Sequence, residues 1–143
     1  MVTVEVLYHH PDLIHPEKIE KGDWIDLRAA EDVSLRAGEF RMISLGISVR
    51  IPQGYELLIA PRSSTFKNFG ILQTNSVGVV DESYCTAEDI LMMPVLAMRD
   101  TVIRFNDRIC QCRLLSHQPE IEWRETDRLD GEKRGGFGSS GIK

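Results

Sequence analysis

The sequence predicts one all-β domain, arranged as a sandwich, jelly roll or barrel. Short runs of β-type residues dominate the chain, beginning at residues 2–6, where apolar and polar residues alternate. Turns containing Gly and Pro, such as residues 52–54, separate these runs at short intervals. The 143 residues fit one domain with one core, and they lack the alternating strands and helices that build parallel sheets.

Each expected element follows from a local pattern. The expected strands cover residues 2–6, 40–45, 46–51, 55–60, 76–80, 90–93, 95–98, 108–115 and 121–124. A short helix is expected over residues 63–70. Ser63 and Ser64 are residue types that cap helix starts, and Gly70 is the type that most often follows a helix end.

Composition limits the classes of function. The 17 basic and 22 acidic residues give a formal charge of −5, so no nucleic-acid partner is expected, because that needs a basic face. The chain has neither a signal peptide nor the ~20 apolar residues of a spanning helix, which predicts a cytoplasmic protein without a membrane partner. The 3 cysteines lack CxxC spacing, so neither disulfides nor a zinc site are expected.

The C-terminal segment differs in composition from the rest, which predicts a β domain at residues 1–130 and a flexible arm at residues 131–143. Glycine-rich ends are usually frayed tails. This one also supplies a fixed positive charge, two hydroxyls, an aromatic ring and unshielded backbone N–H groups: Arg134, Ser139, Ser140, Phe137 and Gly138. Such groups suit a phosphate and a stacked base, so we expect the arm to order over a ligand.

A second anion site is expected where a strand gives way to the helix. Arg62 adds a positive charge beside the hydroxyls of Ser63 and Ser64, at a helix start that offers free N–H groups. The alternative, weighed equally on this motif alone, is that both serines only cap the helix and Arg62 lies in solvent.

Residues 75–84 are expected to form a β-hairpin or a bent strand pair. Gly78 allows another group to approach the backbone closely. Asp81 ends an apolar strand, where a carboxylate can hold and deprotonate a water, although a turn aspartate is the commoner finding. Tyr84 is either a core residue or a platform under a sugar ring.

Two further clusters contain polar residues. Asp23 and Asp26 lie three apart, so chelation of a cation is possible, and a structural role for Asp26 is equally possible. Trp24 is expected in the core. Strict alternation along residues 107–112 places Arg108 on one face and Gln111 on the other.

These clusters, in this order, resemble the five signature motifs of the trimeric dUTPase family. The matching segments are residues 22–29, 61–64, 75–84, 107–111 and 134–141. The resemblance implies a jelly-roll homotrimer whose active sites are shared between subunits and closed by flexible C-terminal arms. It implies hydrolysis of dUTP to dUMP and pyrophosphate, which keeps uracil out of DNA and supplies dUMP for dTMP synthesis.

The resemblance also implies residue roles. Asp81 corresponds to the catalytic aspartate that orients the attacking water, with Asp26 in a supporting role. The implied substrate-binding residues are Arg62, Ser63, Ser64, Asn75, Gly78, Tyr84, Gln111, Arg134, Phe137, Gly138, Ser139 and Ser140. Tyr84 is expected to pack under the deoxyribose. Mg²⁺ is the implied cofactor, held mainly by phosphates and water rather than directly by the protein.

The chain departs from the family pattern at several positions. The usual Ala-Gly-Tyr-Asp-Leu is replaced by residues 23–27, Asp-Trp-Ile-Asp-Leu. Cys85 and Thr86 follow Tyr84 where a basic residue and glycine are usual, and Asn106 stands where glycine is common. The variant resembles dUTPases of some Gram-positive bacteria and their phages.

Two other functions compete with dUTP hydrolysis. A dCTP deaminase shares the fold, but residues 75–84 offer no clear extra acid–base pair for deamination. A binding or regulatory protein on the same scaffold would use residues 86–94 to contact a protein partner, and such a role is compatible with catalysis.

Overall fold

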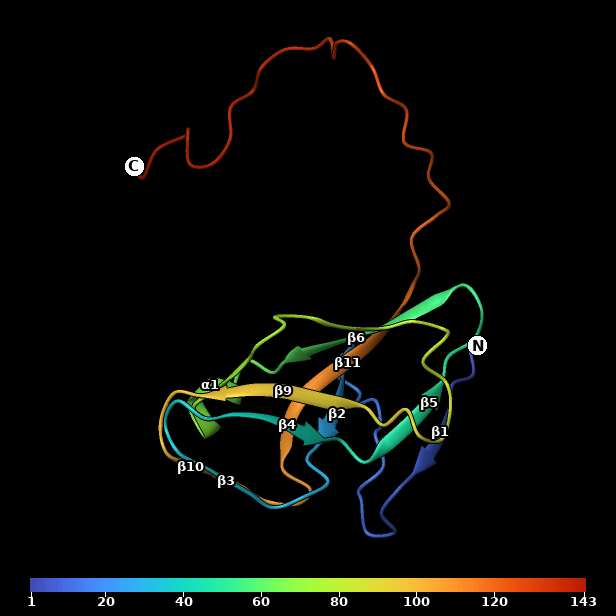
Figure 1. Ribbon diagram of the computed structural model, residues 1–143, viewed down its shortest axis with the longest axis vertical. Helices are drawn as coiled ribbons and strands as arrows, with labels where there is room; N and C mark the ends of the chain where they lie inside the picture. Colours follow the sequence, from blue (N-terminus) through green and yellow to red (C-terminus); the bar gives the residue numbers. More distant parts are fainter.

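The computed structural model describes residues 1–143 and is almost entirely β (Figure 1). The strands are β1 (Glu5–Tyr8), β2 (Ile25–Arg28), β3 (Val33–Leu35), β4 (Phe40–Ser44), β5 (Ile47–Arg50), β6 (Tyr55–Pro61), β7 (Ile71–Gln73), β8 (Gly78–Val80), β9 (Met92–Ala97), β10 (Thr101–Ile103) and β11 (Arg108–Ser116). One helix, α1 (Thr65–Phe69), lies between β6 and β7. It is too short to cross a membrane, and no other helix is present.

The strands form four antiparallel sheets around one core. The largest has the order β2-β11-β6-β8, and a three-stranded sheet has the order β4-β9-β7. Two further sheets have two strands each, β1-β5 and β3-β10. Together the four sheets are called the body below. The two larger sheets each bury side chains completely, for example Ile109 on β11 and Met93 on β9. These side chains belong to a single apolar cluster, so the body folds as one unit.

Several expected strands are confirmed, at residues 40–45, 46–51, 55–60 and 108–115, which become β4, β5, β6 and β11. The first strand starts at Glu5 rather than residue 2. Sequence reasoning missed β2, β3, β7 and β10. These strands have only three or four residues each, which is too short for a period-two pattern to stand out.

Pro94 does not interrupt β9, although two strands were expected on either side of it. Its carbonyl accepts a hydrogen bond from the Thr74 backbone N–H at 3.0 Å. In a strand the N–H and C=O of one residue point to the same neighbour, so the missing N–H of Pro94 also faces this side. There β7 has already ended at Gln73, so the proline removes no bond of the β7–β9 ladder.

The chain crosses from one sheet to another between β7 and β8. Strand β7 pairs with β9, whereas β8 pairs with β6. Residues 75–84 contain only β8, so both the hairpin and the bent strand pair expected there are wrong. Ser76 turns the chain with a positive φ of 59°. Near the crossing, the buried side chain of Gln73 donates to the Ile59 carbonyl at 2.9 Å and links the two sheets.

Asn106 occupies a left-handed position, with a φ of 72°. Asparagine is the side chain that best tolerates this conformation after glycine, which explains how it can stand where the family usually has glycine. The side chain also fastens the N-terminal loop: it accepts from the Ile14 N–H at 2.9 Å and donates to the Asp12 carbonyl at 3.0 Å.

Beyond β11 the chain leaves the body. Residues 117–143 form no strand or helix and are exposed. His117 still donates its backbone N–H to the Gly54 carbonyl at 3.0 Å, and the chain beyond it extends far from the sheets (Figure 1). The strand expected at residues 121–124 is therefore wrong for the single chain, because no neighbouring strand lies beside it. The division at residue 130 remains a prediction.

Candidate active site

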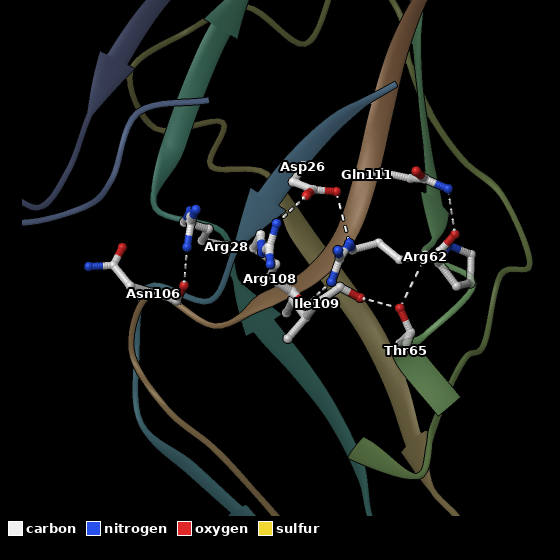
Figure 2. A network of polar contacts seen from close by, with 9 residues as sticks. Asp26, Arg28, Arg62, Thr65, Asn106, Arg108, Ile109 and Gln111 are labelled. Carbon is white, nitrogen blue, oxygen red and sulfur yellow. Dashed lines mark hydrogen bonds and ion pairs between the residues drawn. The ribbon is translucent and has the colours of Figure 1, made fainter. Parts of the chain in front are cut away.

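Three charged side chains from three segments meet at one end of the large sheet (Figure 2). Asp26 on β2 lies between Arg62, which directly follows β6, and Arg108, which begins β11. The Arg62 Nε is 2.9 Å from one carboxylate oxygen, and the Arg108 Nη1 is 3.3 Å from the other. The group keeps a net positive charge, which suits an anion.

The hydroxyl of Thr65 holds the turn that contains Arg62. This buried oxygen accepts from the Arg62 backbone N–H at 2.8 Å and donates to the Ile109 carbonyl at 2.9 Å (Figure 2). The turn is thereby tied to β11, and α1 begins directly after it. Sequence reasoning missed Thr65, although a threonine three residues after Arg62 is well placed to bond its N–H.

The two serines before Thr65 keep their hydroxyls free of protein partners. Ser64 is the N-cap residue of α1, but its side chain makes no capping bond. Ser63 is exposed. The alternative in which both serines only cap the helix is therefore wrong, and both hydroxyls remain available to a ligand.

A β-bulge in β11 decides which way Arg108 faces. The pairing of β11 with β2 shifts between Arg108 and Cys110, which makes Ile109 the extra residue of a bulge. Arg108 and Gln111 consequently line the same pocket, so the opposite faces predicted for them are wrong.

This pocket has a volume of about 350 Å³ and is called the arginine pocket below. Its polar lining includes Arg62, Ser63, Arg108 and Gln111, together with the carboxylates of Asp26, Asp23 and Glu17. The Gln111 amide is oriented by a 2.9 Å hydrogen bond to the Pro61 carbonyl. Three segments of the chain thus converge on a cavity whose two guanidinium groups, hydroxyl and amide can donate to an anion.

The neighbouring Asp23 does not join Asp26 as a chelating pair. Its carboxylate pairs with Arg113 at 2.9 Å, whereas Asp26 is occupied by its two arginines. Trp24, expected in the core, is only half-buried, and the Arg113 guanidinium lies over its ring, 5.5 Å from the centroid.

A second cavity, the aspartate pocket, lies where β8 ends. It has a volume of about 310 Å³, and its lining includes Asn75, Gly78, Asp81 and Tyr84. The Tyr84 hydroxyl donates to the Ile90 carbonyl at 2.9 Å, which fixes a ring that is 40% exposed. Apolar side chains, among them Met92, complete a wall suited to a flat, largely apolar ring.

Asp81 sits in a turn that keeps its carboxylate ionised. The Ser83 hydroxyl and the Ser83 backbone N–H, the latter at 2.7 Å, both donate to Oδ1. The bond from the hydroxyl is the largest cause, followed by the backbone bond, of a pKa for Asp81 below its usual range. The other oxygen, Oδ2, has no protein partner and is free to accept a hydrogen bond from water.

Replacing Ser83 by Ala is expected to shift the acid limb of the pH–rate profile to higher pH. The wild-type bonds lower the pKa of Asp81, so the carboxylate stays charged as the pH falls. Losing the hydroxyl raises that pKa, and activity that needs the ionised form then fails at a higher pH. Steady-state rates measured from acid to neutral pH check this.

Ser83→Thr is the matched control, because it keeps the hydroxyl and should keep the wild-type profile. An acid limb that does not move in the folded Ser83→Ala variant would contradict the role given to this turn.

The two pockets lie far apart within one chain. Val80 pairs with Leu57, so Asp81 lies beside Glu56 at one end of β6, whereas Arg62 follows its other end. Arg62 lies six positions after Glu56 along this strand, which corresponds to roughly 20 Å. The triphosphate of a single nucleotide is much shorter, so one chain cannot bring Asp81 and Arg62 to the same phosphate group.

The residues of the predicted arm touch neither pocket. Phe137 is fully exposed with a φ of 51°, and local turns are its segment's only internal bonds, such as Ser139 N–H to the Gly136 carbonyl at 3.1 Å. Arg134 has no ion-pair partner and Ser140 is exposed. Their place in a site remains a prediction.

Comparisons with known proteins identify relatives of this chain. The dUTPase family model matches residues 15–141. The chain is 52% identical to the SPbeta prophage-derived deoxyuridine 5'-triphosphate nucleotidohydrolase of Bacillus subtilis, covering 99% of this chain and 100% of that relative. It is 34% identical to the deoxyuridine 5'-triphosphate nucleotidohydrolase of Maricaulis maris, covering 99% and 97% of the two chains.

Solved structures share the fold. The dUTPase of Streptococcus mutans superposes with a TM-score of 0.71 at 22% identity, covering 83% of this chain and 98% of that one. A mutant dUTPase of Staphylococcus bacteriophage 80alpha with dUpNHpp gives 0.77 at 20% identity, covering 98% and 99%. The predicted jelly roll is thereby confirmed. Taken with the family match over nearly the whole length, these likenesses show that the chain belongs to the dUTPase family.

Proposed function

We propose that the chain hydrolyses dUTP to dUMP and pyrophosphate at sites shared between the subunits of a homotrimer. The observation that carries this proposal is the pair of complementary, separated pockets. The arginine pocket is lined by side chains that can bind an anion. The aspartate pocket has a carboxylate beside an apolar wall that suits a flat ring. A nucleoside in the aspartate pocket of one copy can place its phosphates in the arginine pocket of another, which accounts for the roughly 20 Å between them.

In this proposal Asp81 orients the attacking water. Its Oδ2 accepts a hydrogen bond from a water that attacks the α-phosphorus, and the bond to the bridging oxygen breaks as pyrophosphate leaves. Because its pKa is lowered, Asp81 is a weak base, so it mainly aligns the water and takes the proton late, when bond formation has made the water acidic. Removing dUTP keeps uracil out of DNA, and the product dUMP serves dTMP synthesis.

The other polar residues bind and cover the nucleotide. Arg62, Ser63, Ser64 and Gln111 bind phosphate oxygens, and Asn75 with the backbone near Gly78 reads the uracil. The arm then closes over the site, with Arg134, Gly138, Ser139 and Ser140 on the phosphates and Phe137 on the base. Closure excludes water and adds a positive charge where negative charge develops.

The donor set fits a magnesium ion that enters with the substrate. The structure contains no group of three or more His, Cys, Asp or Glu side chains placed to hold a metal. The Asp26 carboxylate is taken up by arginines, which leaves phosphate oxygens and water as the ligands that magnesium prefers. When bound, the ion would neutralise phosphate charge. Product assays with and without Mg²⁺ test this requirement, and dCTP in place of dUTP tests for deamination.

A subunit-mixing experiment tests the shared site. Asp81→Asn and Arg62→Gln chains are each expected to be inactive alone. Randomly mixed trimers should recover about a quarter of wild-type activity, since one site in four then combines an intact Asp81 with an intact Arg62. Co-expression, a solution mass and a dUTP assay provide the measurement. A trimer that recovers nothing would place the whole site in one chain and contradict the proposal.

Tyr84→Ala is expected to weaken selection against UTP. The fixed ring leaves no room for a ribose 2′-hydroxyl in this proposal, and alanine opens that space. The ratio of kcat/KM for dUTP to that for UTP should fall by about tenfold or more, because excluding a group by packing typically contributes 1–3 kcal/mol. Tyr84→Phe keeps the ring but loses the hydroxyl bond to Ile90, so the ratio should fall by less than in the alanine variant. An unchanged ratio in the alanine variant would remove Tyr84 from sugar selection.

A further inference from the structure

The carboxylate of Asp26 divides its two oxygens between two arginines (Figure 2). Oδ1 lies 2.9 Å from Arg62 Nε, and Oδ2 lies 3.3 Å from Arg108 Nη1. The side chains of Asp26 and Arg62 are 24% and 21% exposed, whereas Arg108 is 49% exposed. The contact with Arg62 is therefore the better protected from screening, and Arg108 has its guanidinium open to the pocket.

Few other contacts hold the Arg62 guanidinium. Its Nη1 donates to the Arg108 carbonyl at 3.3 Å, and the Thr65 hydroxyl holds only its backbone. Without the carboxylate, two like charges would remain side by side with a single hydrogen bond to restrain one of them. Their mutual repulsion would favour conformations in which the guanidinium groups swing apart.

We infer that Asp26 is a positioning residue for triphosphate binding. Its carboxylate holds the guanidinium groups of Arg62 and Arg108 in place before the ligand binds. Arg108 is then a second arginine of the phosphate site. The inference rests on the proposed function, because it takes the anion in the arginine pocket to be the triphosphate of dUTP. Holding both side chains in place before binding lowers the conformational entropy lost when the phosphate arrives.

The sign of one mutational effect separates positioning from charge. A carboxylate close to a phosphate repels it, so Asp26→Asn would strengthen anion binding if only the net charge of the pocket mattered. If Asp26 positions the arginines, the same change weakens binding, because asparagine offers one acceptor oxygen in place of two.

The experiment measures pyrophosphate and deoxyuridine separately by calorimetry, on the full-length assembly. In Asp26→Asn, pyrophosphate should bind about tenfold more weakly, which is a change of about 1.4 kcal/mol. A hydrogen bond to a charged group typically contributes at least that much. Deoxyuridine, which has no phosphate, should bind as it does to the wild type. In steady-state assays the KM for dUTP should rise more than kcat falls.

Two controls sharpen the result. Asp23→Asn removes the same charge from another carboxylate that lines the arginine pocket but pairs with Arg113 rather than with Arg62 or Arg108, so pyrophosphate binding should not weaken. Because Asp26 also holds Arg108, Asp26→Asn should still weaken pyrophosphate binding in an Arg62→Gln background, but by a smaller factor than in the wild type.

Unchanged or tighter pyrophosphate binding in folded Asp26→Asn overturns the inference, and so does an equal loss for both probes, which would indicate a structural role. Should that variant not fold, Arg108→Gln decides: weaker pyrophosphate binding supports the inference, and unchanged binding overturns it. A wild type that binds pyrophosphate but does not hydrolyse dUTP contradicts only the proposed function, since the comparison between variants still decides the role of Asp26.

Discussion

Asp81→Asn is expected to lower kcat by about 10²–10⁴ while nucleotide binding is retained, as is usual when a positioned acid–base group is lost. The amide has nearly the shape of the carboxylate, and its oxygen can still accept a bond from Ser83. It carries no charge, however, and it cannot accept the proton of the attacking water. Single-turnover hydrolysis of dUTP, together with the affinity for a non-hydrolysable analogue, would separate chemistry from binding.

The chain contains a matched control for this variant. Asp89 likewise accepts two bonds from a single residue, although that residue precedes it in the chain: the Thr86 backbone N–H and hydroxyl donate to its carboxylate at 3.0 and 2.9 Å. These bonds, the backbone one first, also lower the pKa of Asp89. Asp89 does not line the aspartate pocket, so Asp89→Asn should turn over at near the wild-type rate. Near-normal turnover in Asp81→Asn would remove that residue from catalysis.

Deleting residues 131–143 is expected to leave a folded body that hydrolyses dUTP about 10²–10³ times more slowly, the range seen when a donor to developing charge is removed. None of these residues belongs to a strand, and none packs on the core, so the deletion should not alter thermal unfolding. The lost activity would come from Arg134, the serine hydroxyls and the exclusion of water.

A shorter deletion and one point variant locate this effect. Removing only residues 142–143 should cost little, because both lie beyond the hydroxyl-bearing positions. Arg134→Gln should reproduce part of the loss, since it removes the fixed charge and keeps the chain length. A full deletion with unchanged turnover would identify the segment as a passive tail.

The fold class could be predicted from sequence because strand length and turn residues are local properties. Strands of five or more residues, such as β6 and β11, are long enough for their composition to indicate a strand. The three-residue strands do not, since their pairing depends on neighbours distant in the chain. The prediction of two strands on either side of Pro94 was wrong because a proline interrupts a sheet only where its missing N–H faces a partner strand.

The candidate site could be predicted in part. The residue types around Arg62 indicate an anion site, and those around Asp81 indicate a bound water. Both clusters line pockets in the structure. The contacts that orient them depend on tertiary structure. Neither the pairing of Asp26 with two arginines nor the Thr65 bond to β11 could be predicted from a sequence pattern, because both contacts join residues that are distant in the chain. The separation of the two pockets follows from strand register, which sequence periodicity alone does not fix.

Because of the bulge at Ile109, the number of residues in the first part of β11 matters for the site. Side chains before and after it are out of phase, so the number of residues between Arg108 and Gln111 decides whether both face one cavity. Shortening this stretch by one residue would turn the arginine toward the opposite side of the sheet while every charged side chain was kept. The length of this segment is therefore as much a part of the site as the identity of its residues.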